Sequence, residues 1–114
     1  MQPHTTTPAP SLEGWDIHHA ADTDWIPWGD TGNARAKILG SGDGYIVALV
    51  EAEAGYTGTP HEHTHTEFLY VVDGQLRNQG QTMVTGDAYV AAIGSKHTDF
   101  QAEHPSTYLI IFKL

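Results

Sequence analysis

The sequence predicts a single all-β domain built as a sandwich or a barrel, and three observations carry this prediction. The chain has 114 residues, which is enough for one compact domain and too few for two. Short apolar runs that contain β-branched and aromatic residues lie between turn-forming Gly, Asp and Pro residues. No long segment has the 3.6-residue periodicity of an amphipathic helix.

The expected strands follow from these short runs, most of which end close to a turn signal. They cover residues 15–18, 34–39, 45–52, 68–73, 75–79, 82–84, 88–93, 98–102 and 106–113. The turn signals are rich in Gly and Asp, and they lie at residues 40–44, 73–74, 79–80 and 85–87. Residues 20–25 are the one segment expected to form a helical turn. Residues 1–13 are rich in Thr and Pro and are predicted to be a flexible tail, so the domain covers residues 14–114.

Composition and charge argue against several classes of partner. The chain has 14 acidic and five basic residues, which gives a net charge of −9 with neutral histidines. Nucleic acids and anionic membranes bind clustered cations, so neither is an expected partner. No apolar run approaches the roughly 18 residues of a membrane span. The first ten residues lack the basic and apolar regions of a signal peptide, so a cytoplasmic protein is expected.

Three of the eight histidines lie within five residues, and the chain has no cysteine. Any metal must therefore bind through nitrogen and oxygen atoms. On a strand, His61 and His63 would point to the same side about 7 Å apart, and both can reach one ion at about 2.1 Å. Glu67 has the same parity but can join them only if residues 64–66 bend the chain back. A solvated histidine-rich loop is the alternative that this spacing leaves open.

The wider pattern around these residues resembles the two motifs of the cupin superfamily. The first motif, G(X)5HXH(X)3–4E(X)6G, is matched at every position by Gly55, His61, His63, Glu67 and Gly74. The second motif, G(X)5PXG(X)2H(X)3N, is matched in spacing by Gly86, Ala92, Gly94, His97 and Gln101, with Ala92 in place of Pro and Gln101 in place of Asn. Residues 25–29 and 36–39 are also similar to the start of the ChrR-like group of cupins.

The resemblance implies a double-stranded β-helix, also called a jelly-roll barrel, and one divalent transition metal. It implies that His61, His63, Glu67 and His97 hold this metal. Iron is the leading candidate, with Mn, Ni, Cu and Zn as alternatives. Because cupins include many oxygen-using enzymes, we expect a dioxygenase-type oxidoreductase that acts on a small oxygenated compound. The alternatives are a non-catalytic zinc-binding sensor domain and a metal-dependent isomerase or decarboxylase.

Five further residues are candidates for contact with the substrate or its protons. His65 lies inside the expected bend, where it is a substitute ligand, a proton carrier or a solvated side chain. Asp99 and Gln101 share the parity of His97, so they are expected either to touch substrate or bound water or to lie on a solvated rim. Arg35 and Lys37 share one strand face and are the best candidates for binding an anionic substrate; otherwise they belong to the surface.

The aromatic residues predict how the domain packs. Tyr56 and Tyr89 either gate the mouth of the site or pack in its wall. Trp25 and Trp28 belong either to the core or to a subunit interface. Because a small domain has little interior for large rings, a homodimer is expected.

Overall fold

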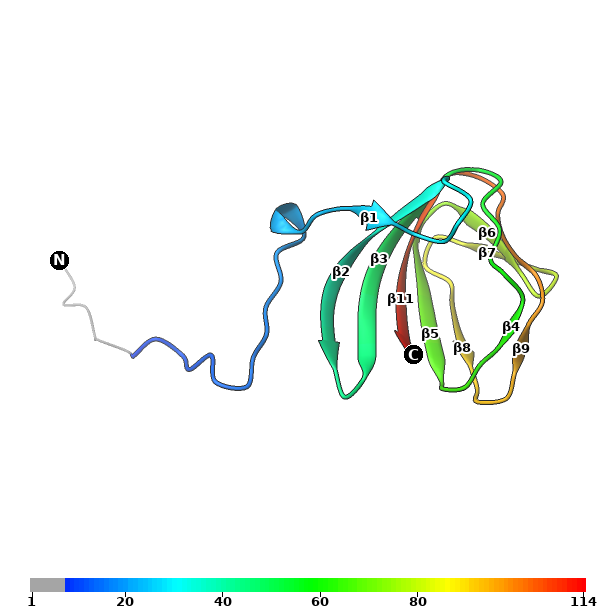
Figure 1. The fold of residues 1–114 in the computed structure, drawn as a ribbon. Helices are drawn as coiled ribbons and strands as arrows, with labels where there is room; N and C mark the ends of the chain where they lie inside the picture. Colours follow the sequence, from blue (N-terminus) through cyan, green and yellow to red (C-terminus); the bar gives the residue numbers. More distant parts are fainter. Residues whose placement is uncertain (1–7) are drawn as a thin grey trace.

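The computed structural model describes residues 8–114, which form a barrel of antiparallel strands and an N-terminal segment that projects from it (Figure 1). A short 3-10 turn, η1 (Ala20–Asp22), precedes the first strand. The strands in chain order are β1 (Ile26–Pro27), β2 (Ala34–Gly42), β3 (Tyr45–Ala52), β4 (His61–Glu62), β5 (Glu67–Asp73), β6 (Gln75–Asn78), β7 (Gln81–Val84), β8 (Ala88–Ala91), β9 (Lys96–His97), β10 (Phe100–Ala102) and β11 (Ser106–Lys113).

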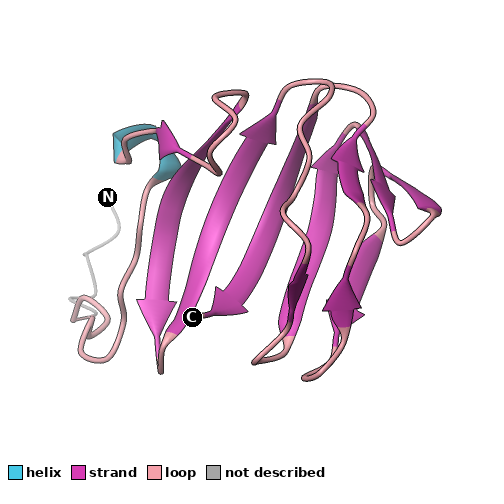
Figure 2. Cartoon of the chain, turned by 45° about the vertical axis from the view of Figure 1, so that its right-hand side comes forward, coloured by secondary structure: helices cyan, strands magenta, loops and turns pink. Residues whose placement is uncertain are grey.

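The strands form one large and two small sheets. The large sheet has the order β1-β2-β3-β11-β5-β8, and its strands lie side by side in Figure 2. One small sheet has the order β10-β6-β7, and the other consists of β4 and β9. The last strand, β11, lies between β3 and β5, so segments far apart in the sequence pair with one another. This architecture confirms the predicted double-stranded β-helix.

Alternation along the strands separates the core from the outer surface. On β5, Leu69 and Val71 are 2% and 0% exposed, whereas Phe68, Tyr70 and Val72 are all more than 40% exposed. This confirms the predicted orientation of β5. Tyr108, the third residue of β11, is fully buried in the same core. The inner faces of the sheets thus enclose one apolar core, as successive side chains of a strand point to opposite faces.

Two hairpins use the predicted turn residues. Asp43 and Gly44 join β2 to β3, and Gln79 and Gly80 join β6 to β7. All four residues have positive φ angles between 50° and 82°. Two-residue turns with positive φ at both positions match the twist of the strands that they connect, which explains the tight pairing on either side.

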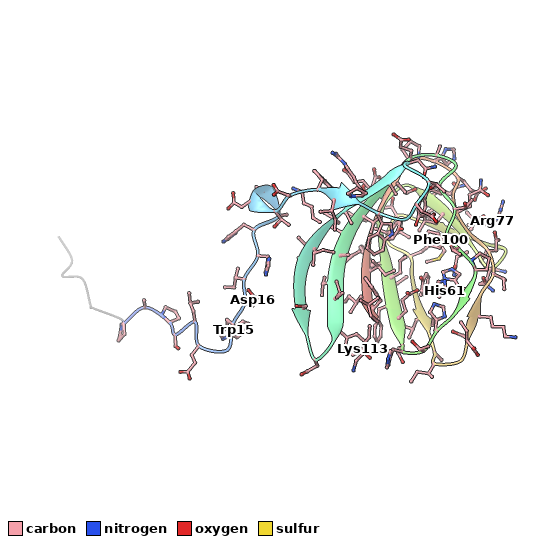
Figure 3. All side chains as sticks on the ribbon, in the orientation of Figure 1. Trp15, Asp16, His61, Arg77, Phe100 and Lys113 are labelled. Atoms are coloured by element: carbon pink, nitrogen blue, oxygen red, sulfur yellow. The ribbon has the colours of Figure 1, made fainter. Side chains whose placement is uncertain are left out.

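One predicted strand is missing from the structure, and short strands occur where none was predicted. Residues 15–18 form no strand, because they project from the barrel where no neighbouring strand completes a ladder (Figure 1). Trp15 is 73% exposed on this segment, and Figure 3 shows it well outside the barrel. Conversely, β4 and β9 were not predicted as strands, since two residues carry no alternation. The expected helical turn is present as η1.

Among residues 8–114, no helix is long and apolar enough to cross a membrane.

Candidate metal centre

Three side chains from residues 61–67 meet His97, which lies much further along the chain. Antiparallel pairing of β4 with β9 sets His61 opposite His97. His63 follows β4 directly, and Glu67 opens β5 after a bend at residues 64–65. One ligand atom from each of the four lies within 4.8 Å of the others. The bend that the sequence required for Glu67 to join the histidines is therefore present.

Backbone contacts fix the orientation of two of the rings. Nδ1 of His61 lies 2.8 Å from the carbonyl oxygen of Thr59, and Nδ1 of His63 lies 3.1 Å from that of Ser95. Because a carbonyl oxygen only accepts, each Nδ1 carries a proton and donates it. Each Nε2 is then left as a lone-pair atom that can bind a cation.

Tyr89, on β8, holds Glu67 in place. Its hydroxyl donates to Glu67 Oε2 over 2.6 Å. Burial raises the pKa of Tyr89 well above its usual value, and the charge of Glu67 raises it further. Tyr89 therefore stays protonated and remains a donor, which leaves the other oxygen of the carboxylate free for further contacts.

The side chains fit a divalent transition metal. Nδ1 of His97 is buried and has no hydrogen-bond partner. Nε2 of His63 lies 3.2 Å from Glu67 Oε2, so two lone-pair atoms face one another and require a proton or a cation between them. Three imidazoles and one carboxylate are a ligand set for Fe, Mn, Ni, Co, Cu or Zn. A bound ion would satisfy the facing atoms of His63 and Glu67.

Acid is expected to release the metal. Burial lowers the pKa of His97 below its ordinary value of about 6.5, with further contributions from His61 and His63. In metal-free protein, the unfolded chain therefore binds a proton on His97 at a higher pH than the folded chain. Stability from this group is present above about pH 6.5 and falls as the pH drops toward the lower folded pKa.

In metal-loaded protein, protons compete with the ion for the same nitrogen atoms. Metal content after dialysis, measured by elemental analysis, should therefore fall as the pH drops below about 6.5. Unchanged metal content at pH 4 would contradict histidine ligation.

A cavity of about 500 Å³ opens beside His61, Glu67 and His97. Its wall is mainly apolar and aromatic, and includes Trp28, Ile38, Ile46, Phe100, Tyr108, Ile110 and Phe112. Tyr56 and Tyr89 also lie in this wall, as the sequence suggested. None of the lining residues that the structure describes is a lysine or an arginine. The cavity therefore offers the ligand group, aromatic faces and a few hydroxyls to a small molecule.

Asp99 and Gln101 do not line this cavity. Arg77 forms a two-pronged ion pair with Asp99 and donates to Gln101 Oε1 over 2.7 Å. These contacts lie at the periphery of the barrel (Figure 3). The chain breaks its alternation between β9 and β10, so that Phe100 rather than its neighbours faces the cavity. Their position outside this cavity agrees with the alternative of a solvated rim, and the regular alternation expected from His97 does not continue.

Arg35 and Lys37 also lie outside the cavity. Arg35 donates to Glu51 and stacks over Trp25, and Lys37 lies 4.8 Å from the same ring. Ala36 takes the inward position between them and is fully buried. Their position agrees with the alternative that these two side chains belong to the surface.

His65 is half-buried in the bend. It lines a separate depression of about 240 Å³ together with His61 and Lys113, and it does not line the main cavity.

Asn78 is a site residue that the sequence analysis missed. Its Oδ1 lies 2.6 Å from Nε2 of His97. Strand alternation contains a signal for it, since Asn78 shares the parity of Leu76, which is fully buried on the same strand. A polar residue at an inward position next to a metal ligand is a candidate partner for that ligand.

Comparisons with known proteins agree with this geometry. The family model of the ChrR cupin-like domain matches residues 15–114. The pectin degradation protein KdgF of Dickeya dadantii is 30% identical over 95 residues, which cover 78% of this chain and 86% of that protein. The structure of KdgF from a Halomonas species is 25% identical, with a TM-score of 0.75, and the match covers 86% of this chain and 92% of that one. An acetylacetone dioxygenase from Acinetobacter johnsonii has the same fold, with a TM-score of 0.77 at 15% identity over 99% of this chain and 80% of that one.

Proposed function

Because the chain belongs to the family of ChrR cupin-like domains, we propose that it is a metal-dependent enzyme of the dioxygenase type. The metal would be one divalent transition ion, with iron as the leading candidate, held by His61, His63, Glu67 and His97. The observation that carries the proposal is that three of these ligands, His61, Glu67 and His97, line the wall of a largely apolar cavity.

The cavity wall favours a neutral substrate of low polarity. Anionic substrates bind where a cation offsets their charge, and the described lining contains neither lysine nor arginine. The bound ion would be the one cation in this wall, and Glu67 would offset part of its charge, so polar oxygens of a substrate are favoured at the ion and apolar groups elsewhere. We therefore propose a small neutral compound that chelates through two oxygen atoms.

When bound, a redox-active ion would polarise substrate oxygens and exchange electrons with molecular oxygen. The protein's own residues would exclude water, hold the substrate and orient the ligands. Trp28 and Phe112, which pack edge to face at 5.7 Å, would exclude water and hold the apolar part of the substrate. Tyr89 would keep Glu67 in one orientation through its short hydrogen bond. His65, in the bend next to the ligands, remains the candidate proton carrier.

The test compares two metal forms with one neutral diketone, acetylacetone. Protein loaded anaerobically with Fe(II) should bind the diketone and consume oxygen once air is admitted, as followed with an oxygen electrode. Zn(II) has no accessible redox change, so the zinc form should bind the compound without consuming oxygen. Equal product formation by both forms would contradict metal-centred redox chemistry.

Lewis-acid chemistry, such as isomerisation or decarboxylation, is the second candidate, because the same ligand set also suits zinc. Turnover by the zinc form without oxygen uptake would favour it. Tight zinc binding with no turnover of any tested compound would favour a sensor domain.

The outer face of the large sheet supports a homodimer. Phe68, Tyr70 and Val72 on β5 and Val90 on β8 form an outer patch in which each side chain is 41% to 66% exposed. Exposed apolar patches of this kind mark interfaces. We propose this patch in place of Trp28, which packs into the cavity wall, and Trp25, which stacks with Arg35.

Light scattering should give twice the chain mass of 12.4 kDa. Tyr70→Lys should shift the protein to the monomer, because it buries a charge in the contact. Val84 is an exposed apolar residue on β7 of the three-stranded sheet, outside the proposed patch. Val84→Lys should therefore leave the dimer intact. A monomeric wild-type protein at high micromolar concentration would contradict the proposal.

A further inference from the structure

We propose that residues 8–19, the N-terminal arm, dock onto the outer face of the large sheet in a second copy of the chain, and that each copy gives its arm to the other. The inference rests on the proposed homodimer and adds to it the segment that each partner contributes. It gives a role to residues 15–18, which have the pattern of a strand but no ladder partner in their own barrel.

The arm is exposed along its whole length. Every residue from 8 to 22 is exposed, and within the described chain the hydrogen bonds of the arm reach no further than Thr23. Figures 1 and 2 show the arm leading away from β2, on the side opposite to β3. Its own barrel therefore buries none of its side chains.

One side of the arm is apolar. Leu12, Trp15 and Ile17 are 67%, 73% and 60% exposed, and large apolar side chains exposed so close together mark an interaction site. Because successive residues of an extended segment point to opposite sides, Trp15 and Ile17 share one side. Asp16 and His18 share the other side, where their side chains lie 3.2 Å apart. This pattern predicts that Trp15 and Ile17 lie against an apolar surface in the assembled protein.

The outer face of the large sheet offers two apolar rows, which the strand register aligns across the sheet. The first row consists of Leu49, Leu109 and Tyr70, and the second consists of Val47, Ile111, Phe68 and Val90. Their neighbours along the strands, such as Tyr108 and Leu69, point into the core. The rows are two residues apart along each strand, about 7 Å, which is also the spacing of Trp15 and Ile17 in an extended arm. An arm that runs along the strands therefore places one of these side chains on each row.

Charge favours a second copy of the chain as the partner. Residues 8–34 include several acidic residues but no lysine or arginine. Three of the five cations of the chain, Arg35, Lys37 and Lys113, have the register of the outer face. Arg35 is paired with Glu51, whereas Lys37 and Lys113 flank the apolar rows. An acidic arm and a face bordered by cations attract one another, and each copy provides both, so the exchange closes with twofold symmetry.

The attachment of the arm directs it to a partner and not to its own sheet. Lys37 on β2 donates to the carbonyl oxygen of Ala20, which holds the base of the arm near the edge of the large sheet. From there the arm continues outward (Figure 1). Reaching the rows on its own β11 and β5 would require the chain to reverse its direction at this base. Exchange of an identical segment between two copies is a low-cost route to a dimer.

The direct test is photocross-linking in the full-length protein. Benzoylphenylalanine, a photoreactive amino acid, replaces Trp15 in unlabelled protein, which is then mixed with a large excess of 15N-labelled wild type and allowed to exchange subunits. Cross-linked peptides, identified by mass spectrometry, should join an unlabelled arm to a 15N-labelled segment of β3, β5, β8 or β11. Any other pattern of links, or none, would overturn the inference.

Substitutions then measure the contribution of the arm. The double variant Trp15→Ala and Ile17→Ala should raise the dissociation constant of the dimer at least about 100-fold in analytical ultracentrifugation, because a few large side chains carry most of the binding energy of an interface. Val84→Ala removes an exposed apolar side chain on β7, outside the large sheet, and should leave the constant unchanged. An unchanged constant in the double variant would overturn the inference.

Failure of the proposed function gives a different result. A wild-type protein that stays monomeric would contradict the homodimer and the arm exchange together. A wild-type dimer that the double substitution leaves intact would contradict the arm exchange alone. Metal content and oxygen uptake test the metal site independently, because the cavity lies on the inner side of the large sheet, where Tyr108 and Ile110 line it.

Discussion

Replacing His61 or His97 by alanine is expected to remove most of the bound metal. Each substitution deletes one of four ligands, and even loss of an outer partner of a ligand lowers metal affinity about 10- to 100-fold. The expected loss is therefore larger than that range. His61 is the exposed member of the group, so His61→Ala should leave the fold intact and isolate the effect on the metal.

The measurement is metal content after dialysis together with zinc affinity by competition with a chelator. His19→Ala and His104→Ala remove exposed histidines outside the group and should bind metal as the wild type does. Glu67→Gln should weaken binding by less, because the amide oxygen remains a ligand and a hydrogen-bond acceptor for Tyr89. Full retention of metal in both His61→Ala and His97→Ala would contradict the site.

Gly74→Ala is expected to cause a large loss of stability. Gly74 joins β5 to β6 with a φ of +110°, a conformation that residues with a side chain rarely adopt. A methyl group there would lie 2.4 Å from Ser106 Oγ and 2.7 Å from the Pro105 carbonyl oxygen. Ser106 opens the central strand β11 and accepts from the amide of Gln75, so it has little freedom to move. Backbone strain and overpacking together should cost about 2–5 kcal/mol.

Urea unfolding of metal-free protein would measure this loss. Gly80→Ala is the matched control, since Gly80 also has a positive φ but no heavy atom within 4 Å of the added carbon. It should cost only the backbone strain, about 1–2 kcal/mol. If the two variants were equally stable, the close approach of Ser106 to Gly74 would be wrong.

The sequence predicts those parts of the fold that depend on local pattern. The ranges predicted for β3 and β11 match the structure, because eight-residue apolar runs between turn signals leave little choice. Residues 15–18 have a similar local pattern but form no strand. A strand at residues 15–18 would need a neighbouring strand to pair with. Whether one lies there depends on where the other strands are in the fold, which the local sequence does not determine.

In the site too, some features follow from local sequence pattern and others depend on the complete fold. Motif spacing predicted the four residues that converge, and alternation predicted the orientation of β5. Alternation failed for Asp99, because the chain changes direction between β9 and β10. Arg35 finds its partner, Glu51, on the neighbouring strand. These contacts follow from strand register, which the sequence determines only through the complete fold.

Pairing of β4 with β9 has a consequence for the stability of the folded state. The ligands span residues 61–97, and two of them face one another across this two-residue ladder. A bound ion would therefore act as a cross-link that closes a long loop in a chain without cysteine. Since the assembled ligand group exists only in the folded state, free metal at 100 times its dissociation constant would add about 2.7 kcal/mol to the stability. A ladder of only two residue pairs would then be held by metal–ligand bonds as well as by its backbone hydrogen bonds whenever metal is plentiful.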